Sequence, residues 1–331
     1  MAKVLLTGGT GFIASHILNV LLERGYSVTA TVRSITKGET ILASHNNIPN
    51  GKLSYVVVPD IAAEGAFDLA VQSTPPFDYV IHTASPFPDS FIDPVKDLLN
   101  PAINGTTGIL KGIKAHAPSV KRVVITSSFA AIVNTASPPK VYDETSWNPV
   151  TWDEAVADRS LAYRGSKTFA EKVAWEFIEK ESPGFDLVAI NPPLVYGPNT
   201  LNSLNTSNQR IRDFIQGKHA TANELPPTGT FLWVDVRDLA LAHVRAIEVP
   251  EAGGNRFFVT AGHCSNKRIV DAIRETHPEL ALRLPRDPVD DFPGRCYGFD
   301  NGRVGRVLGV EFRSLRECMR DTVSSLVAYI L

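Results

Sequence analysis

The feature that most constrains the fold is a glycine turn near the N-terminus, set between an apolar run and an amphipathic segment. It reads Val4-Leu-Leu-Thr-Gly8-Gly-Thr-Gly11-Phe-Ile-Ala14. Gly8 permits a tight turn, Gly11 lets the backbone approach a pyrophosphate, and Ala14 allows the helix to pack closely on the strand. The start of the following helix offers free N–H groups and the positive end of its dipole to an anion. This pattern predicts the strand–turn–helix unit of a dinucleotide-binding domain.

Short, almost wholly apolar runs alternate with longer amphipathic segments over the first 190 residues. This alternation predicts an α/β fold with a doubly wound parallel sheet, covered by helices on both faces. Strands are expected at residues 4–7, 28–32, 55–58, 79–82, 123–126, 187–190 and 231–234, and helices at 11–24, 37–44, 67–72, 94–115, 161–181 and 236–248.

The composition changes after Asn191, where prolines and a stretch rich in Asn, Ser and Thr interrupt the alternation. We expect a second, smaller lobe there, built from separate stretches of chain. The predicted dinucleotide-binding domain is 1–191 plus about 229–259, and the predicted substrate-binding lobe is about 192–228 plus 260–331.

Charge and cysteine content exclude several classes of partner. The 33 Lys and Arg against 35 Asp and Glu give a net charge of −2, so we expect no nucleic-acid partner. No run approaches the roughly 18 apolar residues of a membrane span, so no membrane partner is expected. The three cysteines are too few for a disulfide framework, and reduced thiols favour a cytoplasmic protein.

The end of the second predicted strand bears on the choice of cofactor. A carboxylate there would bind the adenosine ribose of NAD, but this chain has Thr31-Val-Arg33 followed by Lys37. A guanidinium and an ammonium suit the 2′-phosphate of NADPH or NADP+, although both could instead be solvated surface cations. Asp60 could accept the adenine amino group or be an ordinary turn aspartate.

Tyr163 and Lys167 lie four residues apart in a predicted helix and so share one of its faces. A phenol with a pKa of about 10 needs a neighbouring cation to exchange protons near neutral pH. Ser128, which ends a buried strand, could hold a substrate oxygen on which negative charge develops. Ser127 is the alternative. The pattern favours an enzyme in which Tyr163 exchanges a proton as a hydride reaches the substrate.

These motifs resemble the extended short-chain dehydrogenase/reductase family, which has a Rossmann-type fold. The resemblance rests on Thr7–Ile13, Ser128 and Tyr163-Arg-Gly-Ser-Lys167, and His82-Thr-Ala-Ser-Pro86 and Phe231–Asp238 narrow it to the dihydroflavonol 4-reductase branch. Within that branch the chain is most similar to fungal NADPH-dependent methylglyoxal, aldehyde and ketone reductases. The resemblance implies a carbonyl reductase that acts on a small-molecule aldehyde or ketone, as a monomer or homodimer.

The resemblance also assigns roles to single residues. Ser128, Tyr163 and Lys167 would be catalytic, with Tyr163 as the proton donor and Lys167 binding the nicotinamide ribose and tuning the tyrosine. The cofactor would be held by Thr7, Gly8, Gly11, Phe12, Ile13, Arg33, Lys37, Asp60, Ile61, Thr83, Ala84, Ser85, Pro192 and Leu194. Side chains after the strand ends would line an apolar substrate pocket: Phe87, Phe129, Val133 and Tyr196.

Some features depart from the family pattern. Ala102 stands where many members have an asparagine, which puts a proton relay through that position in doubt. No cluster of Cys, His and carboxylates has metal-ligand spacing, so no catalytic metal is expected. His82 and His243 are interpreted as core histidines. Two alternatives stay open: an NAD-dependent nucleotide-sugar epimerase or hydroxysteroid dehydrogenase, and a non-catalytic dinucleotide sensor.

Overall fold

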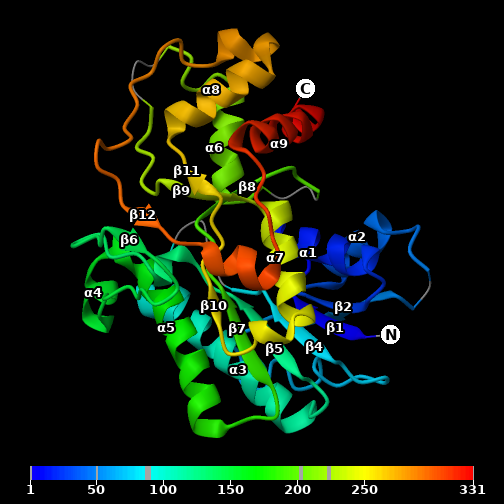
Figure 1. Cartoon of the computed structure of the whole chain (residues 1–331). Coiled ribbons are helices and arrows are strands. Elements are labelled where there is room, and N and C mark those ends of the chain that lie inside the picture. The colour runs from blue at the N-terminus through cyan, green and yellow to red at the C-terminus, as the bar shows by residue number, and fades with distance from the viewer. Residues whose placement is uncertain (1, 50, 86–90, 201–203, 222–224, 331) are drawn as a thin grey trace.

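The computed structural model describes residues 2–49, 51–85, 91–200, 204–221 and 225–330. In this part of the chain, a seven-stranded sheet forms the centre of the larger lobe (Figure 1), and all of its strand pairings are parallel. The strand order is β10-β7-β5-β4-β1-β2-β3. The strands are β1 (Lys3–Thr7), β2 (Ser27–Val32), β3 (Leu53–Val57), β4 (Tyr79–His82), β5 (Arg122–Thr126), β7 (Asp186–Ile190) and β10 (Arg256–Phe257). The predicted α/β fold is therefore confirmed.

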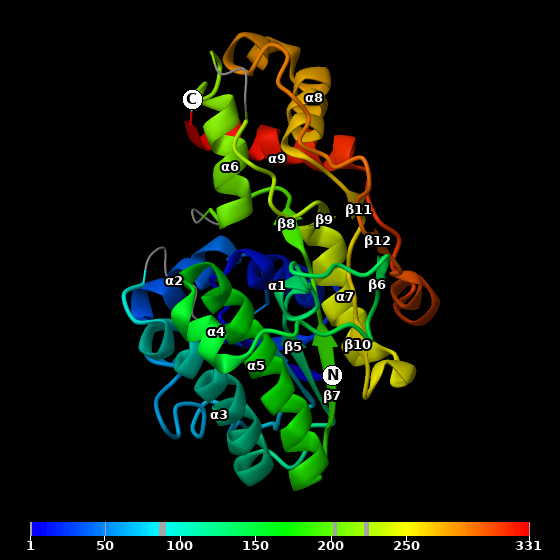
Figure 2. The same ribbon diagram turned by 90° about the vertical axis from the view of Figure 1, so that its left-hand side faces the viewer.

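Helices cover both faces of this sheet, as Figure 2 shows from the side. They are α1 (Phe12–Glu23), α2 (Ile35–Ser44), α3 (Asn100–His116), α5 (Arg159–Glu181) and α7 (Val236–Glu248). The short α4 (Trp152–Ala157) packs against α5. Alternate strand residues point to opposite faces. Val4 and Val124 pack in the core shared with α1 and α7, whereas Leu5 and Val123 pack in the core shared with α3 and α5. The near-continuous apolar character of the strands follows from this two-sided burial.

The smaller lobe lies beyond the carboxyl ends of the strands (Figure 1). Its three-stranded sheet has the order β11-β9-β8. Its elements are β8 (Leu194–Tyr196), α6 (Thr206–Ile215), β9 (Leu232–Asp235), β11 (Gly262–His263), α8 (Asn266–Thr276) and α9 (Leu315–Ile330). A two-stranded sheet pairs β6 (Val141–Tyr142) with β12 (Gly298–Phe299). The lobe is thus built from separate stretches of chain.

One predicted helix is wrong, and several elements were not predicted. Residues 67–72 form turns and no helix. Most of the backbone hydrogen bonds here run from residue i to residue i−3: Asp68 N–H donates to Gly65 O, and Gln72 N–H donates to Leu69 O. Helix α6 forms within the polar stretch, where the Asn205 side chain caps it. The domain boundaries remain a prediction, and β9 pairs in the small sheet although it lies within 229–259.

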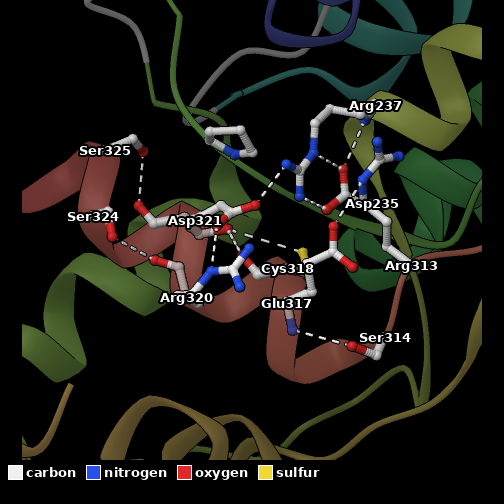
Figure 3. Close-up of polar contacts among 12 residues, drawn as sticks. Asp235, Arg237, Arg313, Ser314, Glu317, Cys318, Arg320, Asp321, Ser324 and Ser325 are labelled. Atoms are coloured by element: carbon white, nitrogen blue, oxygen red, sulfur yellow. Dashed lines mark hydrogen bonds and ion pairs between the residues drawn. The ribbon is translucent and has the colours of Figure 1, made fainter. Parts of the chain in front are cut away.

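Ion pairs fasten α9 to the first turn of α7 (Figure 3). Arg237 Nη1 lies 2.6 Å from Asp321 Oδ2, and Arg237 Nη2 lies 2.8 Å from Asp235 Oδ2. Arg313, just before α9, pairs with the buried Asp238 through its guanidinium and its backbone N–H. These five residues, which we call the lobe junction, hold the end of the chain against the larger lobe.

Among the described residues, no helix combines the length and the apolar character that a membrane crossing requires.

Candidate active site

The glycine turn between β1 and α1 has the geometry that a phosphate cradle requires. Gly8 has φ +69°, and a Cβ there would lie 3.1 Å from Ala84 Cα. A Cβ on Gly9 would lie 2.8 Å from Ala30 Cβ. Gly11 is the N-cap of α1, and no side chain caps that helix. The close packing of the turn therefore requires glycine, and the start of α1 has no side-chain cap on its first N–H groups, which suits a pyrophosphate.

The carboxyl ends of β1 and β4 are tied together beside this turn. Thr83 Oγ1 donates to Thr7 O at 2.6 Å, and Ala84 N–H donates to Thr7 Oγ1 at 3.1 Å. His82 Nδ1 lies 2.8 Å from the same Thr7 hydroxyl. Burial lowers the pKa of His82 to about 3, so its ring is neutral, as expected of a core histidine. These contacts bring Thr83, Ala84 and Ser85 against the glycine turn.

The expected adenosine-binding residues lie along the neighbouring strand ends. Arg33 follows β2, Lys37 lies in the first turn of α2, and both are exposed. Asp60 is exposed after β3 and accepts a hydrogen bond from Ala62 N–H at 2.9 Å, so it caps a turn. Ile61 is partly buried near Gly105. The other expected cofactor residues are also described: Phe12 is buried, Ile13 is partly buried, and Pro192 and Leu194 follow β7.

Ser128 and Tyr163 face one another across the end of β5. Their side chains share a hydrogen bond, which lowers the pKa of Tyr163, but burial raises that pKa more, and the net shift is upward. Ser128 Oγ also accepts from Ala130 N–H at 3.0 Å, which fixes the start of a single 3₁₀ turn. The serine and the phenol are therefore held together before any substrate arrives.

Lys167 lies one helical turn beyond Tyr163 on α5, at the wall of a small cavity of about 20 Å³. The cavity is lined by His82, Ala84, Ser85, Thr106, Ile125, Thr126, Ser127, Lys167, Ala170 and Glu171. Burial lowers the pKa of Lys167 to about 8, and the Glu171 carboxylate opposes this shift. An amine with this pKa gives up its proton far more readily than an exposed lysine.

Ser127 and Ser128 have different partners. The Ser127 hydroxyl donates to Glu171 Oε2 at 2.5 Å, whereas the Ser128 hydroxyl meets Tyr163. The structure thus separates two serines that the sequence alone left as alternatives: one is turned to a buried carboxylate, and the other to the phenol.

A cluster that was not predicted lies beneath this site. We call it the Glu171 network: Ser127, Glu171, Asn191 and Arg256. Asn191 Nδ2 donates to Glu171 Oε2 at 2.7 Å, and Arg256 Nε donates to Glu171 Oε1 at 2.6 Å. A carboxylate four residues beyond Lys167 was the only local signal, and its partners lie far away in sequence.

The expected substrate-contacting residues do not all line an open surface. Phe129 is 2% exposed and stacks on Phe258 with ring centroids 5.2 Å apart. Val133 packs in the same cluster, and Tyr196 is fully buried in the core of the smaller lobe. Phe87 lies outside the described residues. In this conformation Phe129, Val133 and Tyr196 are buried in hydrophobic clusters, and their contacts with a substrate remain a prediction.

Comparison with known proteins agrees with this geometry. A family model described as the NAD dependent epimerase/dehydratase family matches residues 4–261. The chain belongs to this family. It is 55% identical over 331 residues to a ketoreductase of Aspergillus niger, covering 98% of this chain and 97% of the relative. It is 38% identical over 342 residues to the NADPH-dependent methylglyoxal reductase of Saccharomyces cerevisiae, with 99% and 98% covered.

A solved structure extends the likeness to three dimensions. The crystal structure of Gre2 from Candida albicans in complex with NADPH superposes with a TM-score of 0.93 at 36% identity, covering 100% of both chains. The resemblance to fungal NADPH-dependent reductases, inferred from the motifs, is therefore confirmed.

Proposed function

We propose that this chain is an oxidoreductase that reduces an aldehyde or ketone to the alcohol with NADPH, and that Tyr163 donates the proton. The observation that carries the proposal is the meeting of Ser128, Tyr163 and Lys167 beside the glycine turn. The names of the relatives, a ketoreductase and an NADPH-dependent methylglyoxal reductase, support the same reaction class.

The glycine turn and its neighbours fit a dinucleotide. Gly8 and Gly9 let the turn pack closely against Ala84 and Ala30, where a Cβ would collide, and the first turn of α1 would offer its N–H groups to a pyrophosphate. Arg33 and Lys37 would hold the 2′-phosphate, because a planar guanidinium and a flexible ammonium both match its charge. NADPH, when bound, supplies the hydride.

The protein side chains manage the substrate oxygen. Ser128 would hold the carbonyl oxygen where charge develops, and Tyr163 would pass its phenolic proton to that oxygen. The raised pKa of Tyr163 keeps the phenol protonated, which suits a proton donor. The Lys167 ammonium, one helical turn away, would stabilise the phenolate that remains after transfer. Ser127 is assigned no direct contact, because its hydroxyl serves Glu171.

The proposed substrate is a compact, apolar carbonyl compound bound between the two lobes. The aromatic cluster around Phe129 follows Ser128 directly, so its packing would set the shape of that wall. The enzyme would work in the cytoplasm as a monomer or homodimer, and its three cysteines are free thiols.

A direct assay of NADPH oxidation tests the proposal. NADPH oxidation is followed with methylglyoxal, an aryl ketone and a diketone for the unchanged protein, Tyr163→Phe and Arg33→Ala. We expect turnover that Tyr163→Phe abolishes, and an NADPH KM that Arg33→Ala raises about tenfold with little change for NADH. The absence of carbonyl turnover, or a preference for NADH that Arg33→Ala leaves unchanged, would overturn it and favour the NAD-dependent alternative.

A further inference from the structure

Glu171 is the most enclosed carboxylate near the active site, and its side chain is 0% exposed. Its two oxygens receive hydrogen bonds from Ser127, Asn191 and Arg256 at 2.5–2.7 Å, and from Trp175 Nε1 at 3.3 Å. A buried carboxylate with this many donors is held in one orientation, because each lost contact would leave a desolvated charge unsatisfied.

These donors come from the strand ends that carry the site. Ser127 and Ser128 directly follow β5, and Asn191 directly follows β7. Asn191 Nδ2 also donates to Ser128 O at 3.3 Å, and Phe129 N–H donates to Pro192 O at 2.8 Å. Glu171 therefore joins the backbone on both sides of Ser128 to helix α5, which carries Tyr163.

The same carboxylate faces the lysine. Glu171 and Lys167 are four residues apart on α5 and line the same cavity of about 20 Å³. Among the described residues, the titratable groups near Lys167 are Tyr163 and Glu171 from α5 and His82 from β4. Behind Glu171 lies the Arg256 guanidinium from β10, which stacks on Trp147 at 3.8 Å from the ring centroid. Since His82 is neutral, Glu171 is the negative charge among these groups.

We propose that Glu171 is a positioning residue for the reduction: its carboxylate fixes the strand end that carries Ser128 and places a negative charge opposite the Lys167 ammonium. This inference rests on the proposed function, because it assigns Glu171 an effect through Ser128 and Lys167. Glu171 contacts neither substrate nor cofactor in this role. It acts by keeping the serine aligned with Tyr163 and by favouring the charged form of the lysine.

The test is the pH profile of kcat under saturating NADPH for the unchanged protein and Glu171→Gln. The pKa of Lys167 is about 8, so kcat is expected to fall on the alkaline side as the Tyr163–Lys167 pair loses a proton. Removing the carboxylate disfavours the ammonium, so the alkaline midpoint of Glu171→Gln should move to lower pH by about half a unit or more. Its maximal kcat should fall about tenfold, because Ser128 is less well aligned.

Two further variants separate this effect from simple damage to the fold. Glu171→Gln leaves Arg256 as an unpaired buried cation, so the double variant with Arg256→Gln removes both charges and should fold. It should still show a lowered alkaline midpoint, with a smaller shift, because Glu171 is nearer to Lys167 in sequence and lines its cavity. Trp175→Phe removes one weak contact to Glu171 but keeps its charge, and its midpoint should equal that of the unchanged protein.

The outcomes distinguish this inference from the proposed function. If Tyr163→Phe is inactive but Glu171→Gln keeps the unchanged alkaline midpoint, the role of Glu171 is wrong and the function stands. If Glu171→Gln fails to fold, the double variant decides instead: an unchanged alkaline midpoint of kcat in that variant would also show that the role proposed for Glu171 is wrong. If the unchanged protein reduces no carbonyl compound, or Tyr163→Phe is fully active, the proposed function itself fails.

Discussion

The Glu171 network and the lobe junction use the same chemistry, buried carboxylates paired with guanidinium groups, in two different surroundings. Glu171 and Arg256 have side chains that are 0% and 8% exposed, and they lie beside a cavity that Lys167 also lines. At the lobe junction the carboxylates of Asp235 and Asp238 are buried as deeply, but Arg237 and Arg313 are 24% and 35% exposed.

This difference separates two uses of an ion pair. At the lobe junction, partly solvated arginines join α9 to α7, so the pairs fix how the lobes are attached (Figure 3). In the Glu171 network the charge lies next to a titratable amine in a water-poor site, where electrostatic effects are stronger. We therefore expect changes at the junction to alter stability, and changes around the Glu171 network to alter proton transfer.

The largest effect on kcat is expected for Tyr163, which lies on α5, the helix that also carries Glu171. Tyr163→Phe removes the proton donor, so kcat should fall by about a thousandfold or more. The melting temperature and the affinity for NADPH should change little, since only one hydroxyl is lost. Steady-state kinetics, thermal unfolding and a fluorescence titration with NADPH measure these three quantities. Residual activity within tenfold of the unchanged protein would place the proton donor elsewhere.

The paired serines give the next largest effect. Ser128→Ala should lower kcat by about a hundredfold, because it removes a hydrogen bond to the developing charge. Ser127→Ala should lower kcat only a few-fold, but should reduce the free energy of unfolding by about 1–2 kcal/mol, because Glu171 loses a donor. Kinetics and urea unfolding of both variants check this. The reverse pattern would assign the substrate oxygen to Ser127.

A change at the lobe junction should act on stability alone. Asp238→Asn weakens the pairing with Arg313, and we expect the free energy of unfolding to fall by about 2 kcal/mol. The alkaline midpoint of kcat should stay where it is in the unchanged protein. Urea unfolding and the pH profile measure the two effects, and a midpoint that moves as far as in Glu171→Gln would remove the distinction between the networks.

The smallest effect at neutral pH concerns His243 on α7, the helix that begins at the lobe junction. Its Nδ1–H donates to Leu239 O, its Nε2 accepts from the Thr126 hydroxyl, and burial lowers its pKa to about 4. Between about pH 6.5 and 4 the unfolded chain therefore binds a proton that the folded chain does not, so stability falls as the pH falls.

His243→Gln removes the group whose proton binding differs between the folded and the unfolded chain. The free energy of unfolding, measured by urea unfolding from pH 7 to 4.5, should decline less steeply in the variant, by up to roughly 1.4 kcal/mol per pH unit, the slope that one proton gives. An equal slope in both proteins would mean that His243 is protonated in the folded state.

The central sheet and the glycine turn could be predicted because their signals are local. The six predicted strands of the larger lobe lie within two residues of the observed bounds, since each apolar run is bounded by polar or turn residues. Helix α7 was predicted with its observed bounds, 236–248. The helix predicted at 67–72 is wrong because so short a segment rarely outweighs the cost of starting a helix. Helix α4 is as short, but a capping box of Thr151 and Glu154 stabilises its start.

The Glu171 network could not be predicted because it depends on long-range pairing. Arg256 lies 85 residues beyond Glu171, and it reaches the carboxylate only because β10 pairs with β7 at the edge of the sheet. The environments of Phe129 and Tyr196 could not be predicted either. Each residue follows a motif in the sequence and was expected to line the substrate pocket, but tertiary packing buries its side chain in a hydrophobic cluster.

The position of β10 also governs the order in which the molecule can mature during synthesis. β10 is the last strand of the large sheet to emerge, and it carries the guanidinium that neutralises Glu171. A nascent chain that has reached only residue 250 has α5 and β7 but lacks the cation, and burying Glu171 then is costly. We therefore expect the catalytic helix to settle fully onto the sheet only after Arg256, about three-quarters of the way along the chain, has left the ribosome.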